Sequence, residues 1–426
     1  MAIIPSGTKF HGLDSSVNTQ DKGSQSRNSL REAYTIEDIR DTVEGGTSWE
    51  SSQVTLGSLV TSIWLPETTD ANANAAIKPK GTGANVAQVP DGTATGGNAR
   101  GDYATDWQKS RNANTQVAFG DYSTLSGGSL NTANGSYSTV SGGYTNGTGD
   151  AYATVSGGRL NSAGGGTSTV SGGLGNNASA TESTVGGGKN NTSSGTRSFT
   201  ASGELCTASG AAAVALGDRN QATGSYSSVL YGRFATVTSD NSMGGGFFAR
   251  IGGQESVGFG TRVRTYAYGQ FSQASGDFGG DAGQAQVSQL ISRREADLTT
   301  GGTTTLHLDG ASQNFEFNTN NKAANVLAKW VAVVESITGT ATGVSVGDVI
   351  SQDDHFLLKE ISGTMSIVGS VTNTNTKNDT SQSTASMAYS TTSNELGITF
   401  TGATFSGGGT LTYRIVHRII MVEVDF

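Results

Sequence analysis

Ser-Thr-Val-Ser-Gly-Gly occupies residues 138–143, and variants of this segment recur every fifteen residues through the middle of the chain. Three columns of residues stay in register over five successive copies. They are an apolar column (Leu125, Val140, Val155, Val170, Val185), a threonine column (Thr124, Thr139, Thr154, Thr169, Thr184) and an asparagine column (Asn131, Asn146, Asn161, Asn176, Asn191). A fixed period of this kind is typical of a solenoid, in which each repeat forms one coil.

The length of the repeat limits the shape of each coil. A strand rises about 3.3 Å per residue, so fifteen residues give roughly 50 Å of chain, enough for two short strands and two tight turns. Thr139-Val140-Ser141 alternates polar, apolar and polar, which directs Val140 inward. The glycine pair 142–143 is expected in one turn. The asparagine column is expected in the opposite turn, because asparagine tolerates left-handed backbone angles.

The repeat relaxes after Val185 but continues at spacings of fourteen or fifteen residues. It reads Val-Ala-Leu-Gly at 214–217, Val-Leu-Tyr-Gly at 229–232, Met-Gly-Gly-Gly at 243–246 and Val-Gly-Phe-Gly at 257–260. We therefore expect about ten stacked coils, with each strand paired to the coils above and below. Since one column of valines makes a thin core, three copies are expected to pack together as a homotrimer.

The flanking segments predict further domains. Residues 1–45 are predicted to form an extended arm with a short helix starting near Thr35. Residues 46–112 are predicted to form a small β-rich connector, and the rod is assigned to 113–282. Trp49, Trp64 and Trp107 are expected in the core of this connector, with a subunit contact as the alternative. Residues 283–426 carry strand patterns separated by turn residues, which predicts an antiparallel β-sandwich or jelly roll. Its last strand, near 411–424, becomes continuously apolar and is predicted to be central and buried on both faces.

Composition argues against several classes of function. The chain has 426 residues, 62 glycines and a formal charge of −9 without a basic stripe, which argues against nucleic-acid binding. No apolar stretch approaches the roughly 20 residues of a membrane helix, and the first residues lack a secretory pattern. The single cysteine, Cys206, falls in the asparagine column and is interpreted as a small corner residue rather than a reactive thiol.

Candidate catalytic groups are scattered. A glycan-cleaving rod needs two carboxylates about 5–10 Å apart. The acids on the coils share no single column, and no long loops interrupt the repeat; they are Asp121, Asp150, Glu182, Glu204, Asp218 and Glu255. The four histidines are widely separated, so no metal site is predicted. We expect surface acids, no catalytic, cofactor-binding or metal-binding residues, no cofactor and no enzymatic activity.

Tyrosines form a further column with the fifteen-residue period. Tyr122, Tyr137 and Tyr152 occupy equivalent positions in three coils, and Thr167 follows them. We expect these rings to stack on one another between coils. The alternative is that the exposed rings contact a glycan. Regularly spaced hydroxyls on the threonine column also admit an ice-binding role, although the flanking domains have no place in it.

The coils resemble the haemagglutinin-type repeats of trimeric autotransporter adhesin heads, which form a left-handed parallel β-roll. Val-Ala-Leu-Gly-Asp-Arg-Asn-Gln-Ala-Thr-Gly at 214–224 is close to that repeat. The chain departs from the adhesins in lacking a signal peptide, a coiled-coil stalk and a membrane anchor. Its flanks instead look like phage tail-fibre proteins that carry the same repeats. The similar stretches are Ala-Ile-Ile-Pro-Ser-Gly-Thr-Lys-Phe-His-Gly-Leu at 2–13, Pro-Asp-Gly-Thr-Ala-Thr-Gly-Gly-Asn-Ala-Arg-Gly at 90–101 and Gly-Gln-Ala-Gln-Val at 283–287.

This resemblance implies a homotrimeric fibre of a phage virion, and it points to phages that infect cyanobacteria. Residues 1–45 would attach it to a phage tail or baseplate protein. The distal region would bind a host-surface receptor, either a glycan or a protein. Two alternatives are a glycan-depolymerising tailspike with a carboxylate site between subunits and a fibre that decorates the capsid. The C-terminal domain would bind the receptor, drive trimerisation, or both.

Overall fold

The computed structural model describes residues 53–56, 59–62, 82–276, 285–317 and 322–425. The chain divides into two units, Met1–Lys78 and Pro79–Phe426. In the first unit, β1 (Gln53–Leu56) pairs antiparallel with β2 (Leu59–Ser62). The predicted arm and helix within residues 1–45 lie outside the described residues, as do Trp49 and Trp64.

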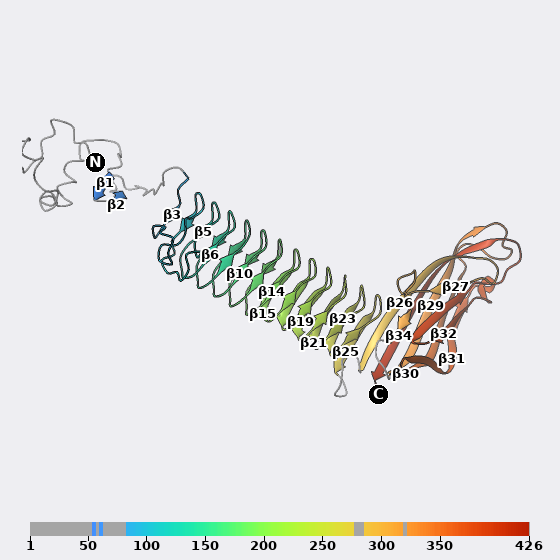
Figure 1. The fold of residues 1–426 in the computed structure, drawn as a ribbon. Helices are drawn as coiled ribbons and strands as arrows, with labels where there is room; N and C mark the ends of the chain where they lie inside the picture. Colours follow the sequence, from blue (N-terminus) through green and yellow to red (C-terminus); the bar gives the residue numbers. More distant parts are fainter. Residues whose placement is uncertain (1–52, 57–58, 63–81, 277–284, 318–321, 426) are drawn as a thin grey trace, which may run out of the picture. The chain divides into compact units, whose positions relative to one another are not determined.

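The middle of the second unit is a solenoid of two parallel sheets (Figure 1). One is a ten-strand sheet formed by β6 (Thr132–Ala133), β8 (Gly147–Thr148), β10 (Ser162–Ala163), β12 (Asn177–Ala178), β14 (Thr192–Ser193), β16 (Thr207–Ala208), β18 (Gln221–Ala222), β20 (Thr236–Val237), β22 (Arg250–Ile251) and β24 (Arg264–Thr265). The other, here called the long sheet, contains β3 (Asn85–Val86), β4 (Thr105–Asp106), β5 (Thr124–Leu125), β7 (Thr139–Val140), β9 (Thr154–Val155), β11 (Thr169–Val170), β13 (Thr184–Val185), β15 (Phe199–Glu204), β17 (Val214–Asp218), β19 (Ser228–Arg233), β21 (Met243–Phe247), β23 (Val257–Thr261) and β25 (Phe271–Gly276). The predicted all-β solenoid is confirmed.

The pairing register follows the repeat. Val140 is opposite Val155 in the next coil, and both side chains are fully buried. In the ten-strand sheet, alanines such as Ala163 and Ala178 face them from the other side of the coil. We expected the rod to begin at residue 113. The parallel pairing of the rod already starts at β3, which pairs with β4, so the rod begins earlier than expected. Trp107, which we expected in a core, is 47% exposed.

The asparagine column lies inside the coils, in the same turn as the glycine pair. The expectations that it occupies the opposite turn and adopts left-handed backbone angles are both wrong. The left-handed residue is the one before it, as at Leu130, Thr145 and Leu160, with φ between 55° and 59°. Each asparagine side chain instead bonds backbone groups. The Asn161 amide nitrogen donates to the Gly157 and Gly173 carbonyls at 2.9 and 3.0 Å. Since these carbonyls belong to two successive coils, asparagine satisfies buried acceptors that the turn would otherwise leave unpaired.

The asparagine side chains also form a continuous ladder. The backbone N–H of Asn161 donates to Oδ1 of Asn146 at 2.9 Å, and the N–H of Asn176 donates to Oδ1 of Asn161 at 3.0 Å. Cys206 continues the column: its N–H donates to Asn191 at 2.9 Å, and its thiol donates to the Gly217 carbonyl at 3.1 Å. The interpretation of Cys206 as a small corner residue fits this position.

A buried ion pair closes the first coils of the rod. Asp106 is fully buried, and its carboxylate accepts bonds from the guanidinium groups of Arg100 and Arg111, each at 2.8 Å. The Arg100 guanidinium also donates to the Gly96 and Asn98 carbonyls. A solenoid needs a terminal cap because its end coil has no neighbour on one side. We therefore identify this cluster as the cap.

The long sheet continues from the solenoid into the C-terminal domain. β26 (Ala285–Leu298) pairs antiparallel with β25, and then the order is β34 (Thr410–Asp425), β29 (Lys322–Thr338), β30 (Val349–Ile361) and β31 (Thr364–Asn378). A second, four-stranded sheet, here called the cover sheet, consists of β27 (Thr303–Leu306), β28 (Phe315–Glu316), β32 (Ser386–Thr392) and β33 (Glu395–Thr401). One short 3-10 helix, η2 (Thr380–Gln382), precedes β32 among the described residues.

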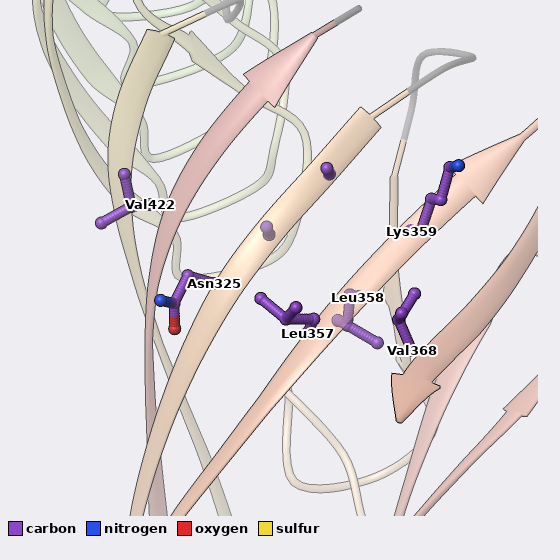
Figure 2. A pocket seen from close by; sticks show the side chains of 8 residues that line it. Asn325, Leu357, Leu358, Lys359, Val368 and Val422 are labelled. Atoms are coloured by element: carbon purple, nitrogen blue, oxygen red, sulfur yellow. The ribbon is translucent and has the colours of Figure 1, made fainter. Parts of the chain in front are cut away.

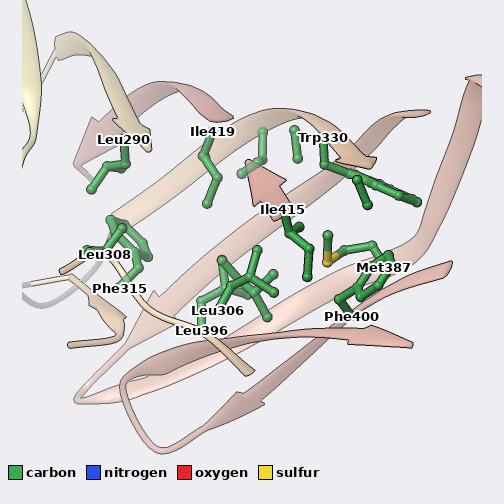
Figure 3. Packing of buried hydrophobic residues seen from close by; sticks show 14 of the residues in the cluster. Leu290, Leu306, Leu308, Phe315, Trp330, Met387, Leu396, Phe400, Ile415 and Ile419 are labelled. Atoms are coloured by element: carbon green, nitrogen blue, oxygen red, sulfur yellow. The ribbon is translucent and has the colours of Figure 1, made fainter. Parts of the chain in front are cut away.

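The two sheets of this domain enclose a large apolar core (Figure 3). Trp330 and Ile415 of the long sheet pack with Phe400 and Leu396 of the cover sheet. Trp330 and Phe400 meet edge to face, with their ring centroids 5.9 Å apart. The predicted antiparallel sandwich is therefore confirmed.

The prediction that the last strand is buried on both faces is wrong for the single chain. β34 is central, between β26 and β29, but its side chains alternate between buried and more exposed positions. Ile415 and Met421 enter the core, whereas Val416 and Val422 are 51% and 54% exposed. The continuous apolar run therefore gives this strand an apolar outer face.

Candidate functional site

The tyrosine column forms a ladder of parallel rings on the surface of the first coils. Tyr122 stacks on Tyr137 with ring centroids 4.8 Å apart, and Tyr137 stacks on Tyr152 at 5.1 Å. Tyr103 extends the ladder at the other end, 4.8 Å from Tyr122. The predicted stacking between coils is confirmed. All four residues have φ between 57° and 60°, which directs one side chain per coil outward from the same corner.

Stacking decides which ring faces a ligand can reach. Tyr122 and Tyr137 each lie between two rings, so both of their faces are covered. Tyr152 has a ring on one side only and is the most exposed of the ladder, at 58%. A sugar ring stacks on an aromatic face rather than on its edge. Tyr152 is therefore the member of the predicted set, Tyr122, Tyr137 and Tyr152, that offers a face to a sugar.

Most candidate acids stay apart in the structure. The carboxylate of Asp121 accepts the backbone N–H of Asp102, and that of Asp150 accepts the N–H of Ala151, so both act locally in turns. Glu182 and Glu255 occupy left-handed corner positions in the same column as the tyrosines, but several coils apart. These four acids form no pair.

The structure does bring Glu204 and Asp218 together, as partners in adjacent coils of the long sheet. Both are tied to cations: Glu204 to Lys189 at 3.0 Å, and Asp218 to Arg233 at 2.9 Å and Arg219 at 3.4 Å. The hydrogen bond from Lys189 lowers the pKa of Glu204. A glycosidase acid needs a raised pKa to donate its proton. As arranged in the single chain, the contact with Lys189 favours the ionised form of Glu204.

The buried histidine of the sandwich belongs to a chain of hydrogen bonds. Nδ1 of His417 lies 3.2 Å from the Ser292 hydroxyl, and Nε2 lies 3.0 Å from the Tyr389 hydroxyl. Tyr389 in turn donates to Asp354 at 2.8 Å, and so does the Trp330 indole at 2.9 Å. Burial lowers the pKa of His417 to about 3. The neutral ring thus connects the two sheets and lies away from solvent.

The outer face of the long sheet changes character along the rod. In the first coils its outward column is the threonine column. From β15 onward the same column holds Phe199, Val214, Ser228, Met243, Val257 and Phe271. A neighbouring outward column adds Leu230, which is 40% exposed. The sequence analysis missed this apolar stripe, although the spacing of fourteen or fifteen residues between these positions would have found it.

The stripe leads onto the outer face of the sandwich. Val287, Val422, Asn325, Leu357 and Val368 form one row across five strands, from β26 to β31. The four apolar residues of this row are 45% to 54% exposed. A shallow hollow lies on this row, and Figure 2 shows the side chains of Val422, Asn325, Leu357 and Val368 around it. We call the stripe and this row together the apolar face.

The described residues contain neither a membrane-spanning helix nor a cluster of metal ligands. None of their helices has the length and apolar character to cross a membrane. In the same residues, no group of three or more histidine, cysteine, aspartate or glutamate side chains is placed to hold a metal ion.

Comparison with known proteins gives matches among solved structures alone: no family model and no curated protein matches the chain. Three matching structures are tailspikes. That of Acinetobacter baumannii phage AM24 is 9% identical with a TM-score of 0.20, and the match covers 69% of this chain and 54% of that one. That of Acinetobacter phage vB_ApiP_P1 is 8% identical with a TM-score of 0.22, over 78% and 68% of the two chains.

The third structure is a tailspike from Acinetobacter baumannii bacteriophage Fri1, described as a capsular polysaccharide depolymerase; it is 9% identical with a TM-score of 0.16, over 76% and 66% of the chains. The expectation of no enzymatic activity is contradicted by this match, and we withdraw it. This chain spans little more than half of the first structure, the AM24 tailspike. At these TM-scores the likeness assigns no activity to this chain.

Proposed function

We propose that the chain is a subunit of a homotrimeric phage tail fibre or tailspike that binds a glycan on the host surface. The apolar face carries the trimeric part of this proposal. It repeats at the spacing of stacked coils over six strands, five of which carry an apolar residue in this column and one, β19, carries Ser228, and it then continues into the sandwich. A contiguous exposed apolar surface marks an interaction site. The partner that matches its period and its length is another copy of the same chain.

The phage assignment has a different support. It rests on the resemblance of residues 2–13, 90–101 and 283–287 to phage tail-fibre proteins. The attachment of residues 1–45 to a phage tail or baseplate protein belongs to the same proposal.

The trimer is tested by light scattering on the purified full-length chain. We expect a mass three times the 43.4 kDa of one chain. Met243→Asp places a charge on the apolar face and should dissociate the trimer. Thr154→Asp is the matched control, because Thr154 occupies the same outward column in the hydroxyl-rich coils. A stable, folded wild-type monomer would exclude the proposed trimer.

The glycan is tested with a panel of bacterial capsular polysaccharides and lipopolysaccharides. We expect the trimer to bind at least one of them and Tyr152→Asn to weaken the binding, since asparagine keeps the left-handed corner but removes the open ring face. Tyr122→Asn is the control, because both faces of that ring are covered. Absence of binding to every glycan of a susceptible host would contradict the proposal.

Cleavage of the glycan is the second candidate function, because the coil register places Glu204 beside Asp218. The same incubations are assayed for new reducing ends. If they appear, Glu204→Gln and Asp218→Asn should abolish them. Persistence of cleavage in both variants would move the reaction to another site.

A further inference from the structure

The tyrosine ladder stops abruptly at one point of the rod. After Tyr152 the same corner column continues with Thr167 and then Glu182, and all three residues are exposed. The short side chain of Thr167 thus stands where a fifth ring would stack. Neighbouring coils are about 4.8 Å apart, so the corners of Tyr152 and Glu182 are separated by roughly 10 Å. We call this place, from the open face of Tyr152 to Glu182, the tyrosine step.

The coil that follows Tyr152 carries very small residues at the step. Its segment before the corner consists of Gly164, Gly165 and Gly166. The fold requires Gly165, because a Cβ there would lie 2.1 Å from the Ala180 carbonyl oxygen. Gly164 and Gly166 have no left-handed φ, and the nearest atoms to a Cβ would be 3.8 and 3.6 Å away. Glycine costs conformational entropy on folding. At these two positions it keeps space open that the coil itself does not need.

Asp150 lies on the open side of the step. Its Oδ1 accepts the backbone N–H of Ala151 at 2.8 Å, and its Oδ2 is the atom nearest to a Cβ built on Gly166 of the next coil, at 3.6 Å. The carboxylate therefore reaches toward the coil that lacks a ring. Glu182 brings a second exposed carboxylate to the step. Ionised carboxylates accept hydrogen bonds and donate none, so both groups suit a ligand that carries hydroxyl groups.

We propose that the tyrosine step binds one neutral pyranose of the host glycan. This inference rests on the proposed function and names the class of sugar. A pyranose has a C–H face and a rim of hydroxyl groups. Its C–H face would meet the electron-rich face of Tyr152 at van der Waals separation, about 4 Å. That position is the one a fifth tyrosine would occupy, over Thr167. The rim hydroxyls would donate to the carboxylates of Asp150 and Glu182.

The covered rings of the ladder prepare Tyr152 for this contact. Its ring lies 5.1 Å from that of Tyr137 at an angle of 7°, and Tyr137 is held in turn by Tyr122 at 4.8 Å and 2°. A ring that is already stacked on one face loses little side-chain freedom when a sugar covers the other, which reduces the entropy cost of binding. Tyr122 and Tyr137 thus contribute to binding without touching the sugar.

The charges around the step favour a neutral sugar over an acidic one. The charged side chains along this corner are Asp102, Asp121, Asp150, Glu182 and, one coil beyond Glu182, Arg197. Four of these five groups are acids. A uronic or sialic acid would bring a further carboxylate beside Asp150 and Glu182, and like charges at such short range repel each other. A neutral hexose offers the same hydroxyl groups without this repulsion.

The test measures binding of the full-length chain to three neutral probes, cellohexaose, mannohexaose and galactohexaose, and to the uronic acid counterpart of each with the same linkage. We expect at least one neutral hexamer to bind, and its acidic counterpart to bind more weakly.

Thr167→Tyr adds the fifth ring and covers Tyr152, so it should weaken binding roughly tenfold or more. Thr167→Asn is the matched control, because asparagine tolerates the left-handed corner and leaves the ring face open. Its affinity should stay within about twofold of the wild type, since no contact with the ring is lost.

Melting curves show whether each variant folds. We expect Thr167→Tyr to fold, since four earlier coils carry tyrosine at this corner; Gly166→Leu, which fills the space beside the same ring face, replaces it if it does not. Equal binding by the wild type and the filled variant overturns the inference. So does equal or tighter binding of the uronic acids, or no binding of any neutral hexamer at millimolar concentration. The proposed function is judged by the trimer mass and by binding of whole host polysaccharides to the wild type, so it survives such a result.

Discussion

The solenoid and the sandwich exclude water from their cores in different ways. In the solenoid each coil contributes small inward residues such as Val155 and Ala163, and the same arrangement repeats from coil to coil. In the sandwich, large side chains such as Trp330, Phe400 and Tyr413 come from strands distant in the sequence. The thin core of the solenoid excludes water because each coil packs closely against the coils on either side of it. The sandwich depends instead on the bulk of a few residues.

The two regions also differ in the polar groups that they bury. Between residues 113 and 263, the buried polar side chains are serine, threonine and asparagine, and the buried ion pair of Asp106 with Arg100 and Arg111 is confined to the first coils. The sandwich buries ionisable groups, among them Asp354, His417 and the pair Lys322 and Glu423, whose charged atoms are 3.2 Å apart. The stability of the solenoid should therefore be most sensitive to substitutions that push neighbouring coils apart. The stability of the sandwich should be most sensitive to low pH.

The strongest test of close approach compares the two glycines of one turn. Gly158 has φ +85°, and a Cβ there would lie 2.3 Å from the Gly173 carbonyl of the next coil. Gly157 has φ +148°, and a Cβ there meets nothing within 4 Å. We expect Gly158→Ala to cost about 3–5 kcal/mol, from backbone strain and overpacking together. Gly157→Ala should cost about 1–2 kcal/mol from strain alone.

Both glycine variants are compared by thermal melting of the full chain at equal concentration. The comparison fails if the two substitutions lower the melting temperature equally. That result would mean that conformational freedom, rather than space between coils, selects glycine at both positions.

The asparagine ladder should give the next largest effect. Asn161→Ala removes two bonds to carbonyls and one to the next backbone N–H, for a loss of about 3 kcal/mol at roughly 1 kcal/mol each. Cys206→Ala in the same column is the control and should cost about 1 kcal/mol, since a thiol is a weak donor. Denaturant unfolding measures both. Similar losses would show that the column is selected for its shape and not for its hydrogen bonds.

Low pH should destabilise the sandwich more than the solenoid, and this effect should be smaller than those of the glycine and asparagine substitutions. The pKa of His417 is about 3 in the folded chain and 6.5 when unfolded, so below pH 6.5 the unfolded chain binds more protons. The free energy of unfolding of the sandwich should therefore decrease as the pH is lowered below 6.5, by about 1.4 kcal/mol per pH unit. At pH 5 the loss should be about 2 kcal/mol. His417→Gln should remove this slope. Calorimetry at pH 7 and pH 5 checks whether the sandwich transition moves while the solenoid transition stays; a shared shift would contradict the assignment.

Sequence periodicity predicted the solenoid well where the period is strict and less well where it relaxes. The motif spacing aligned Val214 with Val229, but the structure pairs Val214 with Ser228, and an irregularity between Ala215 and Asp218 absorbs the extra residue. A slip of one residue exchanges the inward and outward faces of a strand. For this reason the apolar stripe was not predicted, although every residue of it is visible in the sequence.

The candidate site shows the same limit. The stacking of Tyr122, Tyr137 and Tyr152 could be predicted, because one column at one period places the rings at one strand spacing. Arg219 and Arg262 were not grouped, because they lie three coils apart and are linked through Phe234 and Phe248, whose rings stack between them. Nor did the sequence show that Asn161 satisfies two carbonyls of different coils.

The sequence alone determined that this chain builds a stack of coils, because a fifteen-residue period fixes which residues face inward and which pair between neighbours. Only the tertiary structure decided which residues share a surface. That depends on where bulges fall in the relaxed coils and on how β25 passes into β26. The physical reason is that local strand geometry follows from alternation within a few residues, whereas a surface is assembled from residues that the chain separates by whole coils.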